Sequence, residues 1–251
     1  MISFLMSRYQ LPELQELRAI KSAREVSYIV KAQRTAEVVL IEVLRKLKVG
    51  VSEVQLARYI VAAFKRRGVK ALAFEPIVAF GKGSADIHHW ATKTRLQQNQ
   101  IVMFDFGCTV QGYCSDMTRT FWFGNPTAKF KRVYQAVLAA QEKSLRLLVR
   151  GERRTKVIDA AARLPIVRKF GKRAFPHGLG HGVGIAIHEW PNFTPKSRDV
   201  LQSGVVMTVE PGVYIKGWGG VRIEDMVLVK RRGARNLTKA PKSFGSATLR
   251  V

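Results

Sequence analysis

Near the start of the chain, apolar residues recur every three or four positions, as they do along one face of an amphipathic helix. The first such stretch, residues 18–47, predicts one long helix, and Gly50 follows it. Ser52 and Gln55 have the spacing of a capping box and predict the start of a second helix. In all, the periodic stretches predict four helices, at residues 18–47, 52–68, 129–150 and 156–170.

Shorter apolar runs, rich in β-branched and aromatic residues, predict strands between these helices. The predicted strands are residues 74–80, 101–106, 117–123, 182–188, 205–209 and 221–229. The order is therefore two helices and then strands, written twice. Short internal matches support two similar halves: IHHW at 87–90 resembles IHEW at 187–190, and VMFDFG at 102–107 resembles VMTVEPG at 206–212. Two such halves facing each other would place a site on the axis between them.

Two aspartates flank the first predicted hairpin. If the chain folds back near Val110 and Gln111, residues equally far from the turn lie opposite each other. Asp105 then faces Asp116, with Cβ atoms about 5 Å apart. This arithmetic predicts that both carboxylates reach one site.

Two glutamates flank the second predicted hairpin in the same way. A fold-back near Gly217 places Glu210 opposite Glu224. Pro211 cannot donate a hydrogen bond to a strand ladder, so we expect a bulge or an edge at that point. The pairing could therefore be displaced by one residue.

Histidines supply a further set of candidates. His177 and His181 lie in the segment HGLGHGVG, whose glycines argue against a helix and allow the backbone to approach other groups closely. In an extended segment the two histidines share a face. His88 and His188 occupy matching positions in the two halves, which suggests that they flank a cleft and donate to a developing oxyanion. The alternative for each is an ordinary structural histidine.

Five of these side chains suit a pair of divalent metal ions, which prefer hard oxygen and nitrogen ligands. They are Asp105, Asp116, His181, Glu210 and Glu224. Asp105 lies within an apolar run, where a lone charge is unfavourable unless something neutralises it. For the glutamates, a buried ion pair of Glu224 or Asp225 with Arg222 is the structural alternative. Paired metal ions generate a hydroxide at neutral pH and stabilise charge that develops during hydrolysis.

Other hydrolytic and nucleotide-binding motifs are absent from the sequence. There is no GxSxG, no Walker loop and no HExxH, since Asn192 stands where the last histidine of that motif would follow His188 and Glu189. The segment GLGHGVG lacks the third glycine of a dinucleotide-binding fingerprint.

The chain has 251 residues, 47% of them hydrophobic, enough for one large globular domain or two modest ones. It carries 43 basic and 18 acidic residues and a net charge of +25. That charge favours a nucleic-acid, ribosomal or acidic partner, or else reflects a basic proteome or a solubility device; without a recognition motif, we expect nonspecific polyanion affinity. Cys108 and Cys114 match no zinc spacing and are expected to be reduced thiols. No apolar run is long enough to span a bilayer, so we expect a cytoplasmic protein without a membrane partner.

Six motifs together give the chain a specific resemblance: FDFG, SDMTRT, HGLGHGVG, HEWP, EPGVY and VRIEDM. From about Leu17 to about Val229 it resembles the catalytic domain of the pita-bread metallopeptidases, family M24, which include aminopeptidase P, prolidase and methionine aminopeptidase. The resemblance implies the pita-bread (creatinase/aminopeptidase) fold, an α+β fold with two pseudo-symmetric ααβ halves around a dinuclear metal site. We expect an extension at residues 1–17, the catalytic domain at 18–230 and a loosely held basic tail at 231–251. The proline-specific branch usually carries a separate N-terminal domain, and its absence here leaves peptide length and a homodimer as open questions.

The resemblance also implies roles for the candidate residues. The five ligands would bind two metal ions, with Asp116 and Glu224 shared between them. Mn²⁺ is the first candidate metal, and Co²⁺, Fe²⁺ and Zn²⁺ are alternatives. Glu210 would act as general base on the bridging water.

For the substrate, the resemblance implies that His88 and His188 bind it and stabilise the tetrahedral intermediate. His177 would line the substrate pocket, and Arg222 would contribute to substrate binding. The segment GKGSADIHHW departs from the usual family pattern Asn-Ser-Ala-x-Pro-His, so the loop before His88 could be reshaped.

Arg222 precedes Ile223, Glu224 and Asp225 as in the proline-specific branch of the family. The prediction is therefore an exopeptidase that hydrolyses an N-terminal Xaa-Pro bond through a metal-bridged hydroxide, on peptides with proline at the second position. One alternative is a methionine aminopeptidase-like enzyme acting at the ribosome, which the small size and basic surface favour and VRIED opposes. Another is a non-catalytic nucleic-acid- or protein-binding module, which the charge favours and the full set of ligands opposes.

Overall fold

The computed structural model describes residues 12–249, and for residues 12–14 only the backbone. Its helices are α2 (Pro12–Ala19), α3 (Ala23–Leu44), α4 (Glu53–Arg66), α5 (Ala128–Val149) and α6 (Thr155–Phe170), with short 3-10 turns at Gly81–Ala85 and Lys172–Ala174. The strands of the first half are β1 (Ile77–Phe80), β2 (Gln100–Asp105), β3 (Thr109–Val110), β4 (Tyr113–Cys114) and β5 (Thr118–Phe123). The strands that follow α6 in the chain are β6 (Gly180–Gly182), β7 (Glu189–Phe193), β8 (Val206–Val209), β9 (Gly212–Ile215), β10 (Gly219–Arg222), β11 (Asp225–Val229), β12 (Ala234–Asn236) and β13 (Thr248–Leu249), of which β13 returns to the first half.

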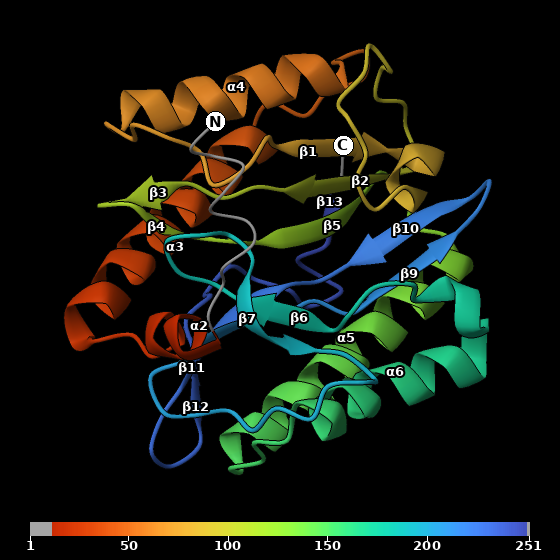
Figure 1. Ribbon diagram of the computed structural model, residues 1–251. Coiled ribbons are helices and arrows are strands. Elements are labelled where there is room, and N and C mark those ends of the chain that lie inside the picture. Colours follow the sequence, from red (N-terminus) through yellow and green to blue (C-terminus); the bar gives the residue numbers. More distant parts are fainter. Residues whose placement is uncertain (1–11, 250–251) are drawn as a thin grey trace, which may run out of the picture.

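The two halves predicted from the repeated element order are present. The first sheet has the order β1-β2-β5-β13, and the second has the order β12-β11-β8-β6-β7. One hydrophobic core joins α3 and α4 to β1, β2 and β5, and a second joins α5 and α6 to the strands of the other half. In Figure 1, α4 lies above β1 at the top and α5 and α6 lie at the bottom, with the strands between the two helix pairs. This is an α+β architecture of two ααβ halves.

The position of β2 between the two cores explains why its sequence is apolar without alternation. Val102 and Phe104 pack into the core beneath α3 and α4, whereas Ile101 packs into the other core. A strand covered on both faces reads as a continuous apolar run. Asp105 is the last residue of this strand, so its carboxylate lies where the two halves meet.

The long helix predicted over residues 18–47 is present as α3, but it begins five residues later than predicted, and residues 18–19 belong to a separate helix, α2. Ser22 caps α3: its hydroxyl accepts from the Glu25 amide, and the Glu25 carboxylate accepts from the Ser22 amide. This capping box starts α3 at Ala23, after α2 has ended at Ala19. It was not among the predictions. The capping box predicted at Ser52 and Gln55 is confirmed at the start of α4.

Three of the predicted strands differ clearly from those observed. Residues 183–188 are a loop between β6 and β7 rather than a strand, with Gly182 the last residue of β6. Residues 221–229 form two strands, because the ladder is interrupted at Ile223 and Glu224. The predicted strand at 74–80 begins only at Ile77.

The predicted opposition of Asp105 and Asp116 is wrong. Asp105 pairs with Thr118, two residues further along the chain. The turn consists of Gln111 and Gly112, both with positive φ (51° and 81°), instead of lying at residues 110 and 111. A two-residue turn of this kind matches the strand twist and fixes the register two positions away from the prediction.

The predicted opposition of Glu210 and Glu224 is confirmed in register. On one side of them Gly212 pairs with Arg222, and on the other side Val209 pairs with Asp225. The two glutamates therefore face each other at a break between two ladders, and no residue is inserted. The break falls at Pro211, where a missing ladder donor was expected.

The basic tail is packed against the domain, not loosely held as we expected. Residues 234–236 form β12 beside β11, and residues 248–249 form β13, parallel to β5. Leu237, Ala240 and Ala247 are buried. Residues 250–251, and residues 1–11 of the predicted extension, lie outside the described part of the chain. No helix among the described residues is long and apolar enough to cross a membrane.

Candidate metal centre

The five predicted ligands all line one cavity of about 770 Å³ between the two halves. Asp105 ends β2, and Asp116 precedes β5. His181 lies in the middle of β6, and Glu210 and Glu224 lie at the break between the two ladders of the second half. Each half thus contributes one pair of carboxylates, and the second half adds the imidazole.

Three of these residues form the closest group. Asp116, His181 and Glu224 each offer a ligand atom, and these atoms all lie within 4.8 Å of one another. His181 links this group to a fourth ligand, because its Nε2 atom lies 3.6 Å from Asp116 Oδ2 and 3.2 Å from Glu210 Oε1. The Nδ1 atom of His181 lies 3.0 Å from the carbonyl oxygen of Gly182. A proton on Nδ1 would satisfy that carbonyl and leave Nε2 as a lone-pair donor toward a cation.

Asp105, the fifth predicted ligand, is held by Arg222. The Arg222 guanidinium donates to Asp105 Oδ2 at 2.5 Å. The other carboxylate oxygen, Oδ1, is buried and has no hydrogen-bond partner among the described residues. A buried carboxylate oxygen without a donor is the kind of atom that a cation satisfies, since unpaired buried polar atoms are rare in native proteins. With four carboxylates and one imidazole, the residues present fit a site for hard divalent ions.

Threonine hydroxyls orient the two glutamates. Thr118 donates to Glu224 Oε2 at 2.7 Å, and its carbonyl accepts from the Glu224 amide. Thr208 donates to Glu210 Oε1 at 3.1 Å. Because Glu210 and Glu224 lie at the ladder break, their amides bond to other segments, that of Glu210 to the carbonyl of Leu179. Neither threonine was predicted, although Thr118 directly follows the SDM of the motif SDMTRT.

The glycines of HGLGHGVG are explained by close packing of backbones. A Cβ atom added at Gly180 would collide with the carbonyl oxygen of Thr208. One added at Gly178 would lie 2.7 Å from the carbonyl oxygen of Phe193. The glycines therefore let β6 approach its neighbours, which brings His181 to the carboxylates.

The buried carboxylates repel one another. Burial raises the pKa of Asp116 well above its usual value, and the neighbouring carboxylates, above all Glu224, raise it further. Burial and the charge of Glu210 act on the pKa of Glu224 in the same direction. Glu210 is the exception: burial raises its pKa, but the hydrogen bond and charge of His181 outweigh this and bring it to about 2. Without a cation, Asp116 and Glu224 therefore hold protons well above the pH at which an exposed carboxyl loses them.

Metal binding is therefore expected to release protons and to strengthen as the pH rises. Since the folded-state pKa values of Asp116 and Glu224 are raised, the folded protein binds more protons than the unfolded chain above about pH 4.5. The stability of the metal-free protein should then fall as the pH rises from about 5 to about 8, and saturating Mn²⁺ should suppress this fall. Titration calorimetry in two buffers of different ionisation enthalpy, with thermal melts across that range, measures both effects. Binding without proton release would contradict the assignment of these carboxyls.

His177 belongs to a chain of buried hydrogen bonds that sequence reasoning did not foresee. Its Nε2 atom lies 2.9 Å from the Tyr214 hydroxyl, which accepts from Arg222 at 2.8 Å. Its Nδ1 atom lies 2.7 Å from the Gly178 carbonyl, so a neutral ring protonated at Nδ1 would accept from Tyr214. Burial lowers the pKa of His177, which favours the neutral ring. The chain runs on through Arg222 to Asp105, and Tyr214 could have been suspected only from the motif EPGVY.

Arg222 is 3% exposed. Besides Asp105 and Tyr214, it donates through Nε to the Thr118 hydroxyl at 2.9 Å. The structural alternative, a buried ion pair of Arg222 with Glu224, is therefore not observed. Asp225 pairs instead with Arg119, at 2.8 Å, and with Lys242.

His88 and His188 both line the cavity, as the internal repeat predicted. The ring of His188 stacks edge-to-face on that of His181, with centroids 4.3 Å apart. Burial, with the neighbouring His181, lowers the pKa of His188. Trp90, two residues beyond His88, lies at the rim and is 74% exposed. His89 also lines the cavity, and its Nε2 atom lies 2.9 Å from a carboxylate oxygen of the buried Glu53.

The two cysteines are free and buried. Burial raises the pKa of Cys108 to about 12 and that of Cys114 to about 11. Both thiols are therefore protonated at neutral pH.

Comparison with known proteins agrees with this geometry. The model of metallopeptidase family M24 matches residues 27–231. An Xaa-Pro dipeptidase of Pyrococcus horikoshii is 37% identical over 232 residues, which are 92% of this chain and 66% of that protein. An uncharacterized peptidase of Staphylococcus aureus is 38% identical over 229 residues, 91% of this chain and 65% of that protein. The chain thus spans just under two thirds of the length of these relatives.

Solved structures give the same fold. An X-Pro aminopeptidase from Thermotoga maritima superposes with a TM-score of 0.89 at 33% identity, over 95% of this chain and 66% of that one. A prolidase from Pyrococcus furiosus has a TM-score of 0.86 at 37% identity, over 91% and 67%. The similarity therefore extends to nearly all of this chain, and both structures share its architecture of two halves.

Proposed function

Since the chain belongs to metallopeptidase family M24, a family with the pita-bread fold, we propose that it is a metal-dependent exopeptidase that hydrolyses an N-terminal Xaa-Pro bond. The observation that carries this proposal is the convergence of four carboxylates and one imidazole in one cavity, with a buried Asp105 oxygen that has no hydrogen-bond partner within residues 12–249. The proteins similar to this chain include both an Xaa-Pro dipeptidase and an X-Pro aminopeptidase, which supports action beside proline.

The proposed cofactor is a pair of divalent ions held by Asp105, Asp116, His181, Glu210 and Glu224. Mn²⁺ is the first candidate, and Co²⁺, Fe²⁺ and Zn²⁺ are alternatives, because oxygen-rich ligand sets accept all of them. When bound, such ions lower the pKa of a water molecule and neutralise charge on the scissile carbonyl. In the closest group of ligands, Asp116 comes from the first half and His181 and Glu224 come from the second. This group would therefore bind an ion between the two halves.

Glu210 is the proposed general base. With its pKa at about 2 it is ionised at neutral pH, and it lies at the cavity edge beside His181. Its carboxylate can take the proton of the attacking water and then deliver it to the proline nitrogen when the carbon–nitrogen bond breaks. This transfer serves proline well, because its nitrogen lacks an N–H and leaves as a secondary amine.

The histidines of the cavity are proposed to handle the substrate. His188 carries a lowered pKa and is a neutral donor that can stabilise the oxyanion as it forms. His88 lines the same cavity from the other half and could bind the substrate carbonyl. His177, fixed through Tyr214, would line the pocket next to Glu210.

Arg222 was predicted to bind substrate, but its contacts favour a positioning role. Its three nitrogens are engaged with Thr118, Tyr214 and Asp105. It therefore orients one ligand, Asp105, and one pocket residue, His177 through Tyr214. We propose that it acts through these partners and does not touch the peptide.

The experiment that tests the proposal is a peptidase assay on metal-stripped protein with Mn²⁺ added back. The substrates are Xaa-Pro dipeptides, Xaa-Pro-Yaa tripeptides and Met-Ala-Ser, with the Glu210→Gln variant run beside the unchanged protein. We expect release of the residue before proline, and the preference for dipeptides or tripeptides separates a dipeptidase from an aminopeptidase. Release of methionine alone would favour the methionine aminopeptidase-like alternative. Inactivity on every peptide with each of the four metals would sink the enzymatic proposal and favour a binding module.

Three predictions from the sequence stay predictions: nonspecific polyanion affinity, a homodimer and a cytoplasmic location. One surface feature supports the first. A groove between α3 and α4 is lined by Arg45, Lys46, Arg66 and Arg67, with Glu42 as its acidic residue. Cations gathered in a groove attract phosphate groups, and such binding weakens as salt rises.

A further inference from the structure

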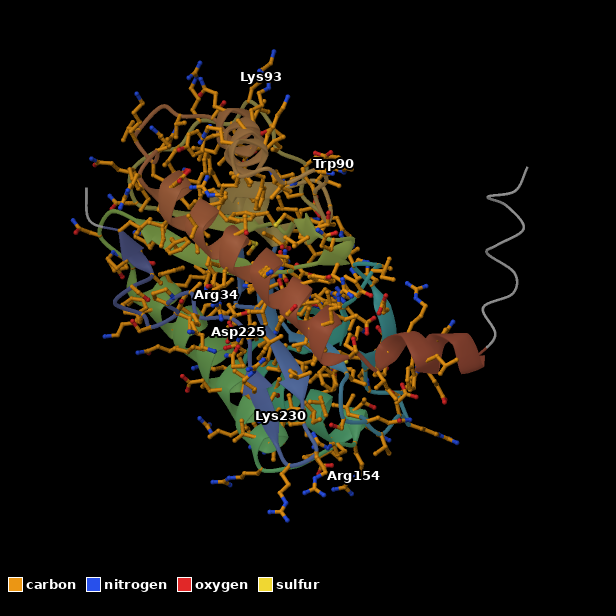
Figure 2. All side chains as sticks on the ribbon, turned by 90° about the vertical axis from the view of Figure 1, so that its left-hand side faces the viewer. Arg34, Trp90, Lys93, Arg154, Asp225 and Lys230 are labelled. Carbon is orange, nitrogen blue, oxygen red and sulfur yellow. The ribbon has the colours of Figure 1, made fainter. Side chains whose placement is uncertain are left out.

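Directly behind the two glutamates of the proposed metal centre lies a second cluster of polar side chains. Its members are Arg119, Gln141, Asp225, Asn236 and Lys242. Arg119, Gln141 and Asp225 are buried, Lys242 is half-buried and Asn236 is exposed. Figure 2 labels Asp225 between Lys93 near one end of the molecule and Arg154 near the other. The cluster joins β5, α5 and β11 to the C-terminal segment, and none of its residues lines the substrate cavity.

Gln141 connects this cluster to both glutamates. Its side-chain nitrogen donates to the carbonyl oxygens of Val209, at 3.3 Å, and Ile223, at 3.4 Å. These residues directly precede Glu210 and Glu224, at the point where the two ladders are interrupted. One fully buried amide therefore bridges the two strands at the break, beside the 3.4 Å hydrogen bond from the Ile223 amide to the Pro211 carbonyl.

Lys242 fixes the orientation of that amide. Its ammonium donates to Gln141 Oε1 at 2.6 Å and also pairs with Asp225 Oδ2. Because Oε1 accepts from the lysine, the amide nitrogen must face the two carbonyls. Without the ammonium, Oε1 would lose its donor, and a flipped amide would set oxygen against oxygen.

Arg119 holds the rest of the segment in place. It is 1% exposed, and all five of its N–H groups are matched to acceptors. Two face the carbonyls of Thr118 and Glu224, at 3.0 and 2.5 Å, and one faces Asp225. The remaining two bond the carbonyls of residues 240 and 241, which bring Lys242 to its place.

We propose that Lys242 is a positioning residue for the metal centre, acting through Gln141 on the separation of Glu210 and Glu224. This inference rests on the metal site of the proposed function. The physical reason is that ligands must be held within about 0.5 Å of their binding geometry by supporting contacts. At this ladder break, the Gln141 amide and the C-terminal segment supply the support that a continuous sheet would give.

The test is Mn²⁺ binding to metal-free protein by titration calorimetry, which needs no peptide turnover. Lys242→Met keeps the length and apolar stem of the side chain and removes the ammonium. We expect about tenfold weaker Mn²⁺ binding, the lower end of the range for losing a supporting contact. Lys242→Arg should restore most of the affinity. The matched control is Lys239→Met, an exposed lysine three residues earlier on the same segment, which should bind within about twofold of the unchanged protein.

A second variant separates positioning from a general loss of stability. Gln141→Leu removes the bridging amide and leaves Lys242 paired with Asp225, so it should fold and should weaken Mn²⁺ binding by at least as much. If Lys242 acts through Gln141, the double variant should bind no more weakly than Gln141→Leu alone. Circular dichroism and melting temperature report folding separately; if Lys242→Met does not fold, Gln141→Leu decides the matter.

Unchanged Mn²⁺ affinity in Lys242→Met or Gln141→Leu, whatever the melting temperature, would overturn the proposal. So would losses that multiply in the double variant. Failure of the proposed function is a different result, in which the unchanged protein binds Mn²⁺ but cleaves no peptide. A protein that binds no metal at all would overturn both.

Discussion

The Glu210→Gln variant is expected to hydrolyse Xaa-Pro peptides at least about a thousandfold more slowly than the unchanged protein. Glutamine keeps the size of the side chain but cannot accept the proton of the attacking water, and removal of a general base lowers kcat by roughly 10² to 10⁴. The variant also replaces a carboxylate that contacts His181 at 3.2 Å, so the neighbouring ligand loses its ionic partner. Steady-state kinetics at saturating Mn²⁺ measure the effect, which should fall on kcat more than on KM.

The control for this variant is Glu142→Gln. Glu142 is a half-exposed carboxylate on α5 whose ion-pair partner among the described residues is Arg146, at 3.6 Å. Its loss should change kcat by less than about twofold, because exposed ion pairs contribute little. If Glu210→Gln retained more than about a tenth of the activity at saturating Mn²⁺, the general base would have to be another residue.

The two hairpins show how far spacing alone can place a site. Around Gly217 the register predicted for Glu210 and Glu224 is the observed one, because the glycines mark the turn unambiguously. Around residue 111 the register is two positions off. There Gln111 adopts a positive φ beside Gly112, and glutamine gives little signal for that conformation. Asp105 and Asp116 still meet in the cavity, since both lie where β2 and β5 approach the second half.

The ligands could be found from the sequence, but the residues that support them could not. A carboxylate inside an apolar run is visible in the sequence, because burial of a lone charge is unfavourable. The contacts of Arg222 with Asp105 and of Gln141 with Val209 join residues 117 and 68 positions apart, and no local periodicity reveals such contacts. For the same reason the basic tail was predicted to be loose. Its composition is polar, but Lys242 and the carbonyls of residues 240 and 241 meet buried partners on β5, α5 and β11.

The Asp116→Asn variant is expected to make the metal-free protein more stable while it abolishes metal binding. In the folded protein Asp116 is surrounded by carboxylates, and both burial and Glu224 raise its pKa. Asparagine keeps the shape and removes the charge, so the repulsion disappears. We expect a gain of about 0.5–2 kcal/mol in the free energy of unfolding, as is typical when a strained functional site is relieved. The gain should increase as the pH rises above the usual pKa of an aspartic acid, because the raised pKa delays loss of the proton from the carboxyl that it replaces.

Asp225→Asn, one residue beyond Glu224, should have the opposite effect. Asp225 is buried like Asp116, but it pairs with Arg119 and Lys242, and these cations lower its pKa. Removing its charge leaves a buried guanidinium without its carboxylate, which destabilises a protein by about 3–5 kcal/mol. Denaturant unfolding of both metal-free variants at pH 8 measures the contrast. If Asp116→Asn lost stability as Asp225→Asn does, Asp116 would be a structural ion-pair partner, and the argument that these carboxylates are held together for a cation would fail.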